Sequence, residues 1–217
     1  MSLILAIDTS SGTSVALVEN GQLRAEHNVA DTMKHAELIG AAIQDVLAQA
    51  FVHPSQIMAV VAGRGPAPFT GLRVGIAAAT MFAAGCGIKL YGAVSLDAMA
   101  LAAIPTLEIS KNTPLLVTTD ARRKEVYWAL YSGVDEHGVP IRLDGPGVMK
   151  PAELEEYLLD RNVHPVTTEL SVSAANLAFL AEAQLRSGTI SEDVSALYLR
   201  AADAVEPKAR IGKAVSG

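Results

Sequence analysis

The chain has 217 residues and a formal charge of −6, from 17 Lys and Arg against 23 Asp and Glu. This acidic balance argues against charge-driven binding to a nucleic-acid backbone, because phosphate contacts need clustered Lys and Arg. Half of the residues are apolar, only 18% are charged, and the mean hydropathy is +0.30. Such a composition excludes long disorder and supplies one large packed domain or two of roughly 100 residues each.

A single cysteine, Cys86, excludes a disulfide framework and a cysteine-based zinc site. It suits a reducing compartment, so a cytoplasmic protein is expected. The opening MSLILAIDTS lacks the basic region and cleavage pattern of a signal peptide and is typical of a strand. The uncharged Gly- and Ala-rich stretch between Arg73 and Lys89 is 15 residues long, short of the roughly 18 to 20 that span a bilayer. No membrane association is expected.

The first half of the chain predicts three strands and then alternating helices and strands. Asn20-Gly21 tolerates positive φ and joins two extended segments as a hairpin does. From Lys34 the apolar residues recur at gaps of three and one, which indicates a helix with one apolar stripe, capped by Asp31 or Thr32. The expected strands are 3–7, 13–18, 22–29, 57–62 and 88–91, and the expected helices are 34–50, 72–84 and 95–103.

The second half begins after Pro105 and the polar segment 108–113, which predicts domains at 1–104 and 105–217. A strand ending in an acid, a turn and a second strand occur in both halves, so Asp8 corresponds to Asp120. The tail from Glu206 to Gly217 is expected to be poorly ordered, or alternatively to return to the first domain. Strands are expected at 115–119, 125–131 and 141–143, and helices at 151–159 and 173–185.

The turn after the first strand is rich in hydroxyls and backbone N–H groups. Such a turn can hold a phosphate, with the aspartate binding a metal or water. The alternative is an ordinary hairpin whose Ser and Thr side chains satisfy local backbone groups. The candidate phosphate loop consists of Asp8, Thr9, Ser10 and Gly12.

The loop Gly63–Gly71 leads into a helix, whose free N–H groups could meet an anion. It is not a Walker A loop, because no Gly-Lys-Ser/Thr follows. In a purely structural alternative, its prolines fix the loop and Phe69 enters a core. Arg73 either clamps an anion or pairs with an acid such as Asp8 or Asp97, and the ion pair is favoured.

The histidines at 27, 35, 53, 137 and 164 show no metal-binding spacing, and His35 on the apolar edge of its helix suits a structural hydrogen bond. No Gly-x-Ser-x-Gly elbow occurs, and Cys86 has no base nearby, so no hydrolase nucleophile is indicated. The run Arg122-Arg123-Lys124 reads as a solvated hairpin tip, with a phosphate contact as the alternative.

Several stretches, in order along almost the whole chain, give it a family resemblance. They are ILAIDTSSGTSVALV, KHAELIGAAIQDVL, GRGPAPFTGLRVGIAAA, VSLDAMA, DARRKEVYWALY and ALYLRAADAVEP. The chain resembles the TsaB (YeaZ) family, small partner subunits of the bacterial machinery that makes threonylcarbamoyladenosine in tRNA. The most specific stretch is Phe69–Arg73. The family usually shows Gly-Pro-Gly-Ser directly before this stretch. This chain has Ala67 and Pro68 in place of the second Gly and the Ser, which stiffens the loop and disfavours close approach of a ligand.

The resemblance implies an α/β fold with two actin-like ATPase (ribonuclease H-like) domains, each a mixed sheet flanked by helices. It also implies a scaffold and not a catalyst, with no cofactor. TsaD, the catalytic relative, carries an Asn-His-x-x-x-His metal run, and alignment sets Ser95, Leu96 and Ala100 against its Asn and two His, so no metal is expected. The alternatives are an acetate-kinase or sugar-kinase phosphotransferase and a metallopeptidase.

The implied partners are TsaD in a heterodimer, TsaE through the complex, and a second copy when the chain is isolated, with tRNA contacted only indirectly. The helix at 72–84 is apolar all round and needs cover on every side. The alternative is that this helix and the helix at 34–50 are both enclosed by other parts of their own domain. The expected interface residues are His35, Leu38, Ile39, Ile43, Ile76, Thr80 and Ala83. The residues expected to support the first domain are Asp8, Phe69, Thr70, Gly71 and Arg73.

Overall fold

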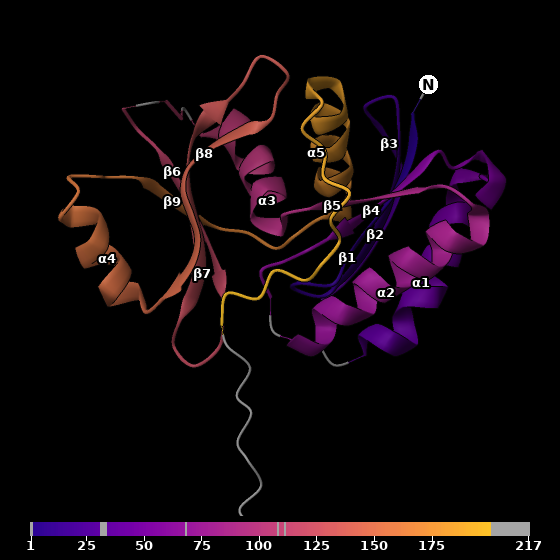
Figure 1. Cartoon of the computed structure of the whole chain (residues 1–217), viewed down its shortest axis with the longest axis horizontal. Helices are drawn as coiled ribbons and strands as arrows, with labels where there is room; N and C mark the ends of the chain where they lie inside the picture. The colour runs from indigo at the N-terminus through magenta and orange to yellow at the C-terminus, as the bar shows by residue number, and fades with distance from the viewer. Residues whose placement is uncertain (1, 31–33, 68, 108, 111, 201–217) are drawn as a thin grey trace, which may run out of the picture.

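The computed structural model contains two β-sheets flanked by helices (Figure 1) and describes residues 2–30, 34–67, 69–107, 109–110 and 112–200. The first sheet has the strand order β3-β2-β1-β4-β5, with the first three strands antiparallel and the last two parallel to β1. Its strands are β1 (Leu3–Asp8), β2 (Thr13–Glu19), β3 (Gln22–Val29), β4 (Ala59–Gly63) and β5 (Lys89–Ala93).

Helices cover both faces of the first sheet, which explains the continuous apolar run of β1. Leu5 and Ile7 pack on the side of α1 (His35–Ala50) and α2 (Phe69–Cys86). The alternate residues Ile4 and Ala6 face α5 (Ala174–Ser187), which arrives from the far end of the chain and lies beside α3 (Ser95–Ala103). The first sheet therefore takes part of its core from the last helix.

The second sheet repeats the first four positions of this order as β8-β7-β6-β9. Helix α3 contacts one face, and α4 (Pro151–Leu159) packs on the other. β1 and β6 occupy equivalent places, and they end in Asp8 and Asp120, the pair that the sequence repeat predicts. The strands are β6 (Leu115–Asp120), β7 (Val126–Val134), β8 (Pro140–Met149) and β9 (Val166–Glu169).

Most predicted elements are confirmed, but the second sheet shows two errors. The prediction missed β9, a four-residue edge strand, and gave β8 only three of its ten residues, since glycine and proline interrupt its apolar pattern. Two 3-10 turns, at Pro54–Gln56 and Ile104–Thr106, were also not expected.

The domain boundary at 104/105 stays a prediction. The cap residues Asp31 and Thr32 and the tail 206–217 lie outside the described residues. In the described part, no helix has both the length and the apolar character for crossing a bilayer.

Candidate functional site

The candidate phosphate loop turns its functional groups inward. Asp8 at the end of β1 is 1% exposed. Its Oδ1 accepts hydrogen bonds from the backbone N–H (2.7 Å) and the hydroxyl (2.5 Å) of Ser10, and its Oδ2 accepts one from the Ser95 hydroxyl (2.6 Å). The carboxylate also lies against Gly63, where a Cβ would come within 1.8 Å of Oδ2. Both oxygens of Asp8 are thus engaged by its own chain.

The Thr9 hydroxyl joins the loop to the start of α2. It donates to the carbonyl of Gly71 (2.8 Å) and accepts from the backbone N–H of Gly75 (3.0 Å). Gly71 is also close to His35, since a Cβ on Gly71 would lie 2.8 Å from Nε2 of the imidazole. A Cβ on Gly75 would lie 2.3 Å from the Thr9 hydroxyl oxygen, and one on Gly71 would lie 3.1 Å from the Thr9 carbonyl oxygen. These two glycines of α2 therefore permit the close approach of the loop. The side chains of Phe69 and Thr70 lie outside the described part of the chain.

The hydroxyls of Ser11 and of the first two residues of β2 also have partners within the chain. Ser11 accepts from the backbone N–H of Val172 (3.1 Å), and Thr13 hydrogen bonds to Nδ1 of His35 (3.0 Å). Ser14 donates to Asn28 (2.5 Å) and accepts from the N–H of Ala174 at the start of α5 (2.7 Å). The loop's hydroxyls thus tie together α1, α2, α5 and β3.

This arrangement does not fit a nucleotide phosphate or its metal. Burial raises the pKa of Asp8, while the bonds from Ser10 and Ser95 oppose the effect, and those bonds already engage both carboxyl oxygens. Gly12 also faces inward, because a Cβ there would lie 2.6 Å from the carbonyl oxygen of Val29.

The three positions that the family resemblance sets against the metal ligands of TsaD are also buried. Leu96 and Ala100 are fully buried in the core between α3 and the second sheet, and Ser95 is bonded to Asp8 and to the backbone N–H of Gly65. Aliphatic side chains cannot hold a metal ion. Within the ranges that the structure describes, no three His, Cys, Asp or Glu side chains are placed to share one.

The seven expected interface residues divide into two groups. His35, Ile39, Ile43 and Ala83 are each less than 9% exposed. Ile39, Ile43 and Ala83 pack in the core between the first sheet and α1 and α2, and His35 bonds to Thr13. Leu38 and Ile76 are half-buried, and Thr80 is exposed. The apolar stripe of α1 therefore faces its own sheet in this chain, and the expectation of a partner contact stays a prediction.

The outward faces of α1 and α2 carry mostly small side chains. Gly40 on α1 is exposed, and a Cβ there would meet nothing within 4 Å. On α2, Ala77, Thr80 and Ala84 are exposed, and Met81, an exposed large apolar side chain, is 72% exposed. We call the surface formed by Gly40, Ala77, Thr80, Met81 and Ala84 the small-residue face. Of these five residues, the set of expected interface residues contained only Thr80.

Arg73 lies in the first turns of α2 and contacts the last described part of the chain. Its Nε donates to the Tyr198 hydroxyl (2.6 Å), and its guanidinium lies 5.4 Å from the centre of that ring. The predicted partners have other bonds: Asp8 is held by Ser10 and Ser95, and Asp97 by Arg142 and Tyr131. Arg73 therefore connects α2 to residues distant in sequence.

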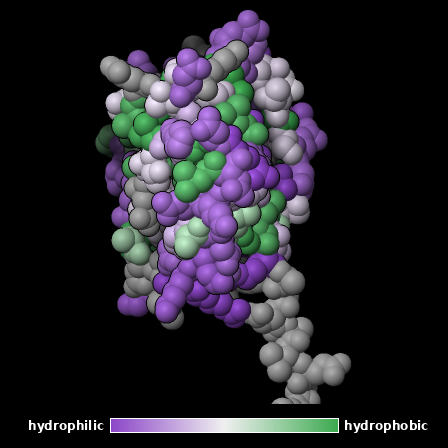
Figure 2. All heavy atoms as spheres, turned by 90° about the vertical axis from the view of Figure 1, so that its left-hand side faces the viewer, coloured by the Kyte–Doolittle hydropathy of each residue, from purple (hydrophilic) through white to green (hydrophobic). Residues whose placement is uncertain are grey.

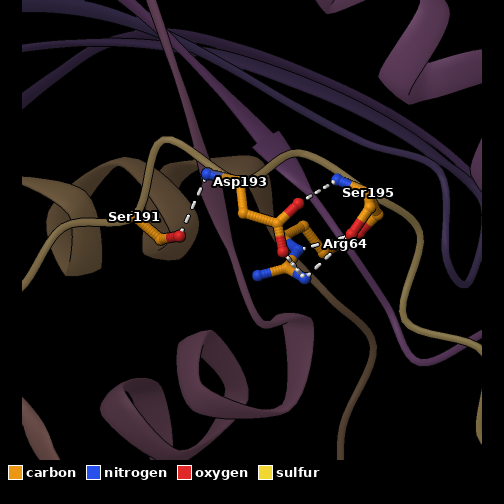
Figure 3. Close-up of polar contacts among 4 residues, drawn as sticks. All are labelled: Arg64, Ser191, Asp193 and Ser195. Atoms are coloured by element: carbon orange, nitrogen blue, oxygen red, sulfur yellow. Dashed lines mark hydrogen bonds and ion pairs between the residues drawn. The ribbon is translucent and has the colours of Figure 1, made fainter.

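Tyr198 belongs to a segment, residues 190–200, that we call the C-terminal strap. Figure 3 shows Arg64 at the centre of its attachment: Nη2 contacts Asp193 Oδ2 (2.6 Å), and Nε donates to the Ser195 carbonyl (2.9 Å). The Gly92 N–H on β5 donates to the carbonyl of Ser191 (2.9 Å). A Cβ on Gly92 would lie 2.1 Å from the Asp193 carbonyl oxygen. Only glycine permits the strap to cross β5 so closely.

An ion pair joins α3 to the second sheet. Asp97 on α3 accepts from Arg142 on β8 (2.6 Å to Oδ1 and 2.5 Å to Oδ2) and from the Tyr131 hydroxyl on β7 (2.7 Å). Burial and the neighbouring Asp97 raise the pKa of Tyr131 well above its usual value. The hydroxyl thus stays protonated and donates to the carboxylate.

A hollow of about 490 Å³ lies between α4 and the outer face of β6 and β9. Figure 2 looks onto this side, where hydrophilic side chains surround separate apolar patches. Its walls combine Leu116, Leu154 and Leu158 with His164 and Glu155. It lies on the opposite face of the sheet from α3 and shares no lining residue with the Asp8 loop.

The strand order of the first sheet, its shortened repetition in the second, and the aspartate at the end of each first strand define the class: actin-like ATPase domains of the ribonuclease H-like type. A family model described as TsaD, tRNA N6-adenosine threonylcarbamoyltransferase, matches residues 29–204. "YeaZ from Pseudomonas aeruginosa" superposes with a TM-score of 0.75 at 26% identity, over 92% of this chain and 100% of that one.

Curated relatives agree with that class. The tRNA threonylcarbamoyladenosine biosynthesis protein TsaB of Escherichia coli is 36% identical over 71% of this chain and 65% of its own length. The uncharacterized protein Rv3421c of Mycobacterium tuberculosis is 37% identical over 71% of this chain and 68% of its own. The match spans only 41% of the length of ML0378 of Mycobacterium leprae. The chain belongs to the TsaB/YeaZ family.

Proposed function

We propose that this chain is a non-catalytic, cytoplasmic subunit of the machinery that makes threonylcarbamoyladenosine in tRNA, and that it docks a TsaD-type transferase. One observation carries the proposal: the hydroxyls of the loop from Thr9 to Ser14, and the Asp8 carboxylate, are satisfied within the chain. A loop engaged in this way supports the fold and leaves the catalytic groups to the partner. The E. coli relative is named for the same biosynthesis.

The docking surface that we propose is the small-residue face. Helices approach to 8–10 Å when the side chains between them are small, and Gly40, Ala77 and Ala84 supply this condition, with Met81 as an apolar side chain to bury. A TsaD-type partner would use this face in the complex, with a TsaE-type ATPase joining through that complex. A second copy of the chain would use it when the chain is alone.

Reconstitution tests the proposal directly. The chain is mixed with TsaD-type and TsaE-type proteins of the same organism, complex mass is measured, and threonylcarbamoyladenosine in tRNA is quantified by mass spectrometry. Ala77→Arg on α2 should give a folded protein that loses the complex and the modified nucleoside. Ala152→Arg, at an exposed alanine on α4, is the matched control and should keep both.

Two results would contradict the proposal. If Ala77→Arg and Ala152→Arg form the complex equally well, the partner does not dock on α2. If the isolated chain hydrolyses ATP or transfers its phosphate, and Asp8→Asn removes that turnover, the phosphotransferase alternative replaces the scaffold.

A further inference from the structure

Four helices in the described part of the chain end in the same hydrogen-bonded motif. After α1, the N–H of Phe51 bonds to the carbonyl of Ala48 (3.2 Å), and the N–H of Val52 bonds to that of Leu47 (3.0 Å). This pair of bonds is the Schellman motif, whose turn needs a residue in the left-handed conformation. The same two bonds recur after α2, α4 and α5. The four left-handed residues are Phe51, Gly87, Asn162 and Gly188, with φ between 54 and 71°.

Phe51 is the exception among these four residues. Glycine adopts the left-handed conformation without steric cost, and asparagine tolerates it better than other side chains do. A phenylalanine strains the backbone there, because its Cβ comes too close to the following carbonyl oxygen. Glycine at position 51 would therefore make the fold more stable, so the fold itself does not favour a phenylalanine.

The ring of Phe51 also adds nothing to the described hydrophobic cores. Phe51 is 94% exposed and belongs to none of them. The apolar contact that usually accompanies a Schellman motif is made by the next residue, Val52, which packs against the first core together with Leu47. A strained backbone that carries a side chain without a role in the fold indicates a role outside it.

Phe51 extends the small-residue face. It follows Gly40 by eleven residues, or three helical turns, so the two positions lie on one side of α1, about 16 Å apart along its axis. Strands β3, β4 and β5 all run in one direction, so α1 and α2, which connect them, run parallel to each other (Figure 1). Phe51 is therefore at the same end of the layer as Ala84. The two most exposed large apolar side chains that the structure describes, Phe51 and Met81, both belong to this layer.

We propose that Phe51 is the aromatic anchor of the docking surface and that its ring enters an apolar recess on the TsaD-type partner. The inference rests on the proposed function for the identity of that partner. A few aromatic side chains buried in recesses supply most of the binding energy of a typical protein interface. A ring that is 94% exposed in the free chain removes a large apolar area from water when it is covered. Small side chains accept many helices, so the ring gives the contact its selectivity.

A second copy of this chain is a less suitable occupant. The hollow between α4 and the second sheet lies at the opposite side of the molecule from α1 (Figure 1). The ring of one copy could enter the hollow of another only in a head-to-tail contact. Such contacts build rings or open filaments and do not form a closed dimer.

The test compares two glycine substitutions in the same motif. Phe51→Gly removes the ring and the backbone strain together, and Asn162→Gly, at the left-handed position after α4, is the matched control. Both variants should melt at or above the temperature of the wild type, by up to about 4 °C. In surface plasmon resonance, Asn162→Gly should bind a TsaD-type protein as the wild type does. Phe51→Gly should bind about 30-fold more weakly, the lower limit for an interface hot spot, mainly through faster dissociation. Phe51→Tyr keeps the ring and should restore most of the affinity.

Three outcomes overturn the inference. One is wild-type affinity of Phe51→Gly for the TsaD-type protein. Another is a lower melting temperature of Phe51→Gly than of the wild type, which shows that the ring is covered by its own chain. The third is weaker self-association with unchanged binding of the TsaD-type protein, which assigns the ring to a second copy. Ala77→Arg separates this failure from that of the proposed function: if only Ala77→Arg loses the complex, the docking surface stands without the anchor, and if the wild type forms no complex, both fail.

Discussion

Arg142 on β8 donates to both carboxylate oxygens of Asp97 on α3, at 2.6 and 2.5 Å. This ion pair connects the second sheet to a helix that also flanks the first. The Asp97 side chain is 13% exposed and that of Arg142 is 29% exposed. The two charges are therefore largely removed from water, and neither can lose its partner without cost.

Arg142→Met should consequently destabilise the whole molecule. Removing one member of a buried pair leaves an uncompensated charge and costs about 3 kcal/mol, which corresponds to a fall in melting temperature of about 6 to 12 °C at this chain length. The double variant with Asp97→Leu should recover part of the loss, because it removes the orphaned carboxylate. Thermal melts followed by circular dichroism measure both, and a double variant less stable than Arg142→Met would contradict this account.

Asp8→Asn should flatten the dependence of stability on pH. The pKa of Asp8 is raised in the folded protein above its ordinary value of 3.8, so the folded state holds the proton more tightly than the unfolded state. As the pH rises above 3.8, the contribution of this carboxyl to the free energy of unfolding therefore decreases. Denaturant melts of the parent and Asp8→Asn from pH 4 to about 7 give the comparison. Parallel curves would show that the carboxyl is not buried as described.

Thr9→Val should weaken the start of α2, because valine leaves the Gly75 N–H and the Gly71 carbonyl without their hydroxyl partner. These two groups lie four residues apart in α2 and can bond to each other, so the expected loss is that of an ordinary hydrogen bond, about 1 kcal/mol. Thr9→Ser keeps the hydroxyl and should remain close to the parent in the same urea titration. If the valine and serine variants unfold at the same urea concentration, the two hydrogen bonds of Thr9 contribute no measurable stability.

Gly92→Ala should lift the strap from β5, since the added Cβ would meet the Asp193 carbonyl at 2.1 Å. The N–H groups of Gly92 and Leu197, which bond to Ser191 and Arg64, report on the strap. Hydrogen exchange should accelerate at position 92 and at Leu197. Gly40→Ala, where nothing lies within 4 Å, is the control and should add about 0.5 to 1 kcal/mol of stability. Unchanged exchange in Gly92→Ala would mean that the strap does not depend on this glycine.

Sequence patterns predicted the elements of the first sheet from apolar runs such as β1 and β2, the stripe of α1 and the turn residues between strands. It failed where contacts join distant residues. Arg73 was assigned an acid as its partner, and the structure gives it Tyr198, which no local pattern connects to α2. Likewise, β9 is short and pairs only with β6, so its four residues carry too little signal.

The interface prediction shows a different limit. The stripe on α1 was identified correctly as apolar, but one apolar stripe serves either the protein's own sheet or a partner, and composition does not distinguish them. In this chain Ile39 and Ile43 serve the sheet. Apart from Met81, the exposed positions of the small-residue face are small or polar, so hydrophobicity alone did not select them.

The return of α5 to the first sheet has a consequence for biosynthesis. During translation, β1 to β5 leave the ribosome long before residues 174–187 exist, and until then one face of the sheet, including Ile4, Ala6 and Val61, lacks its covering helix. Domains that fold as the chain emerges can bury their surface early, but this sheet must wait for nearly the entire chain. A nascent chain stalled before α5 would therefore present an apolar surface to chaperones. A chain that ends before residue 174 would be degraded and would not act as a smaller version of the protein.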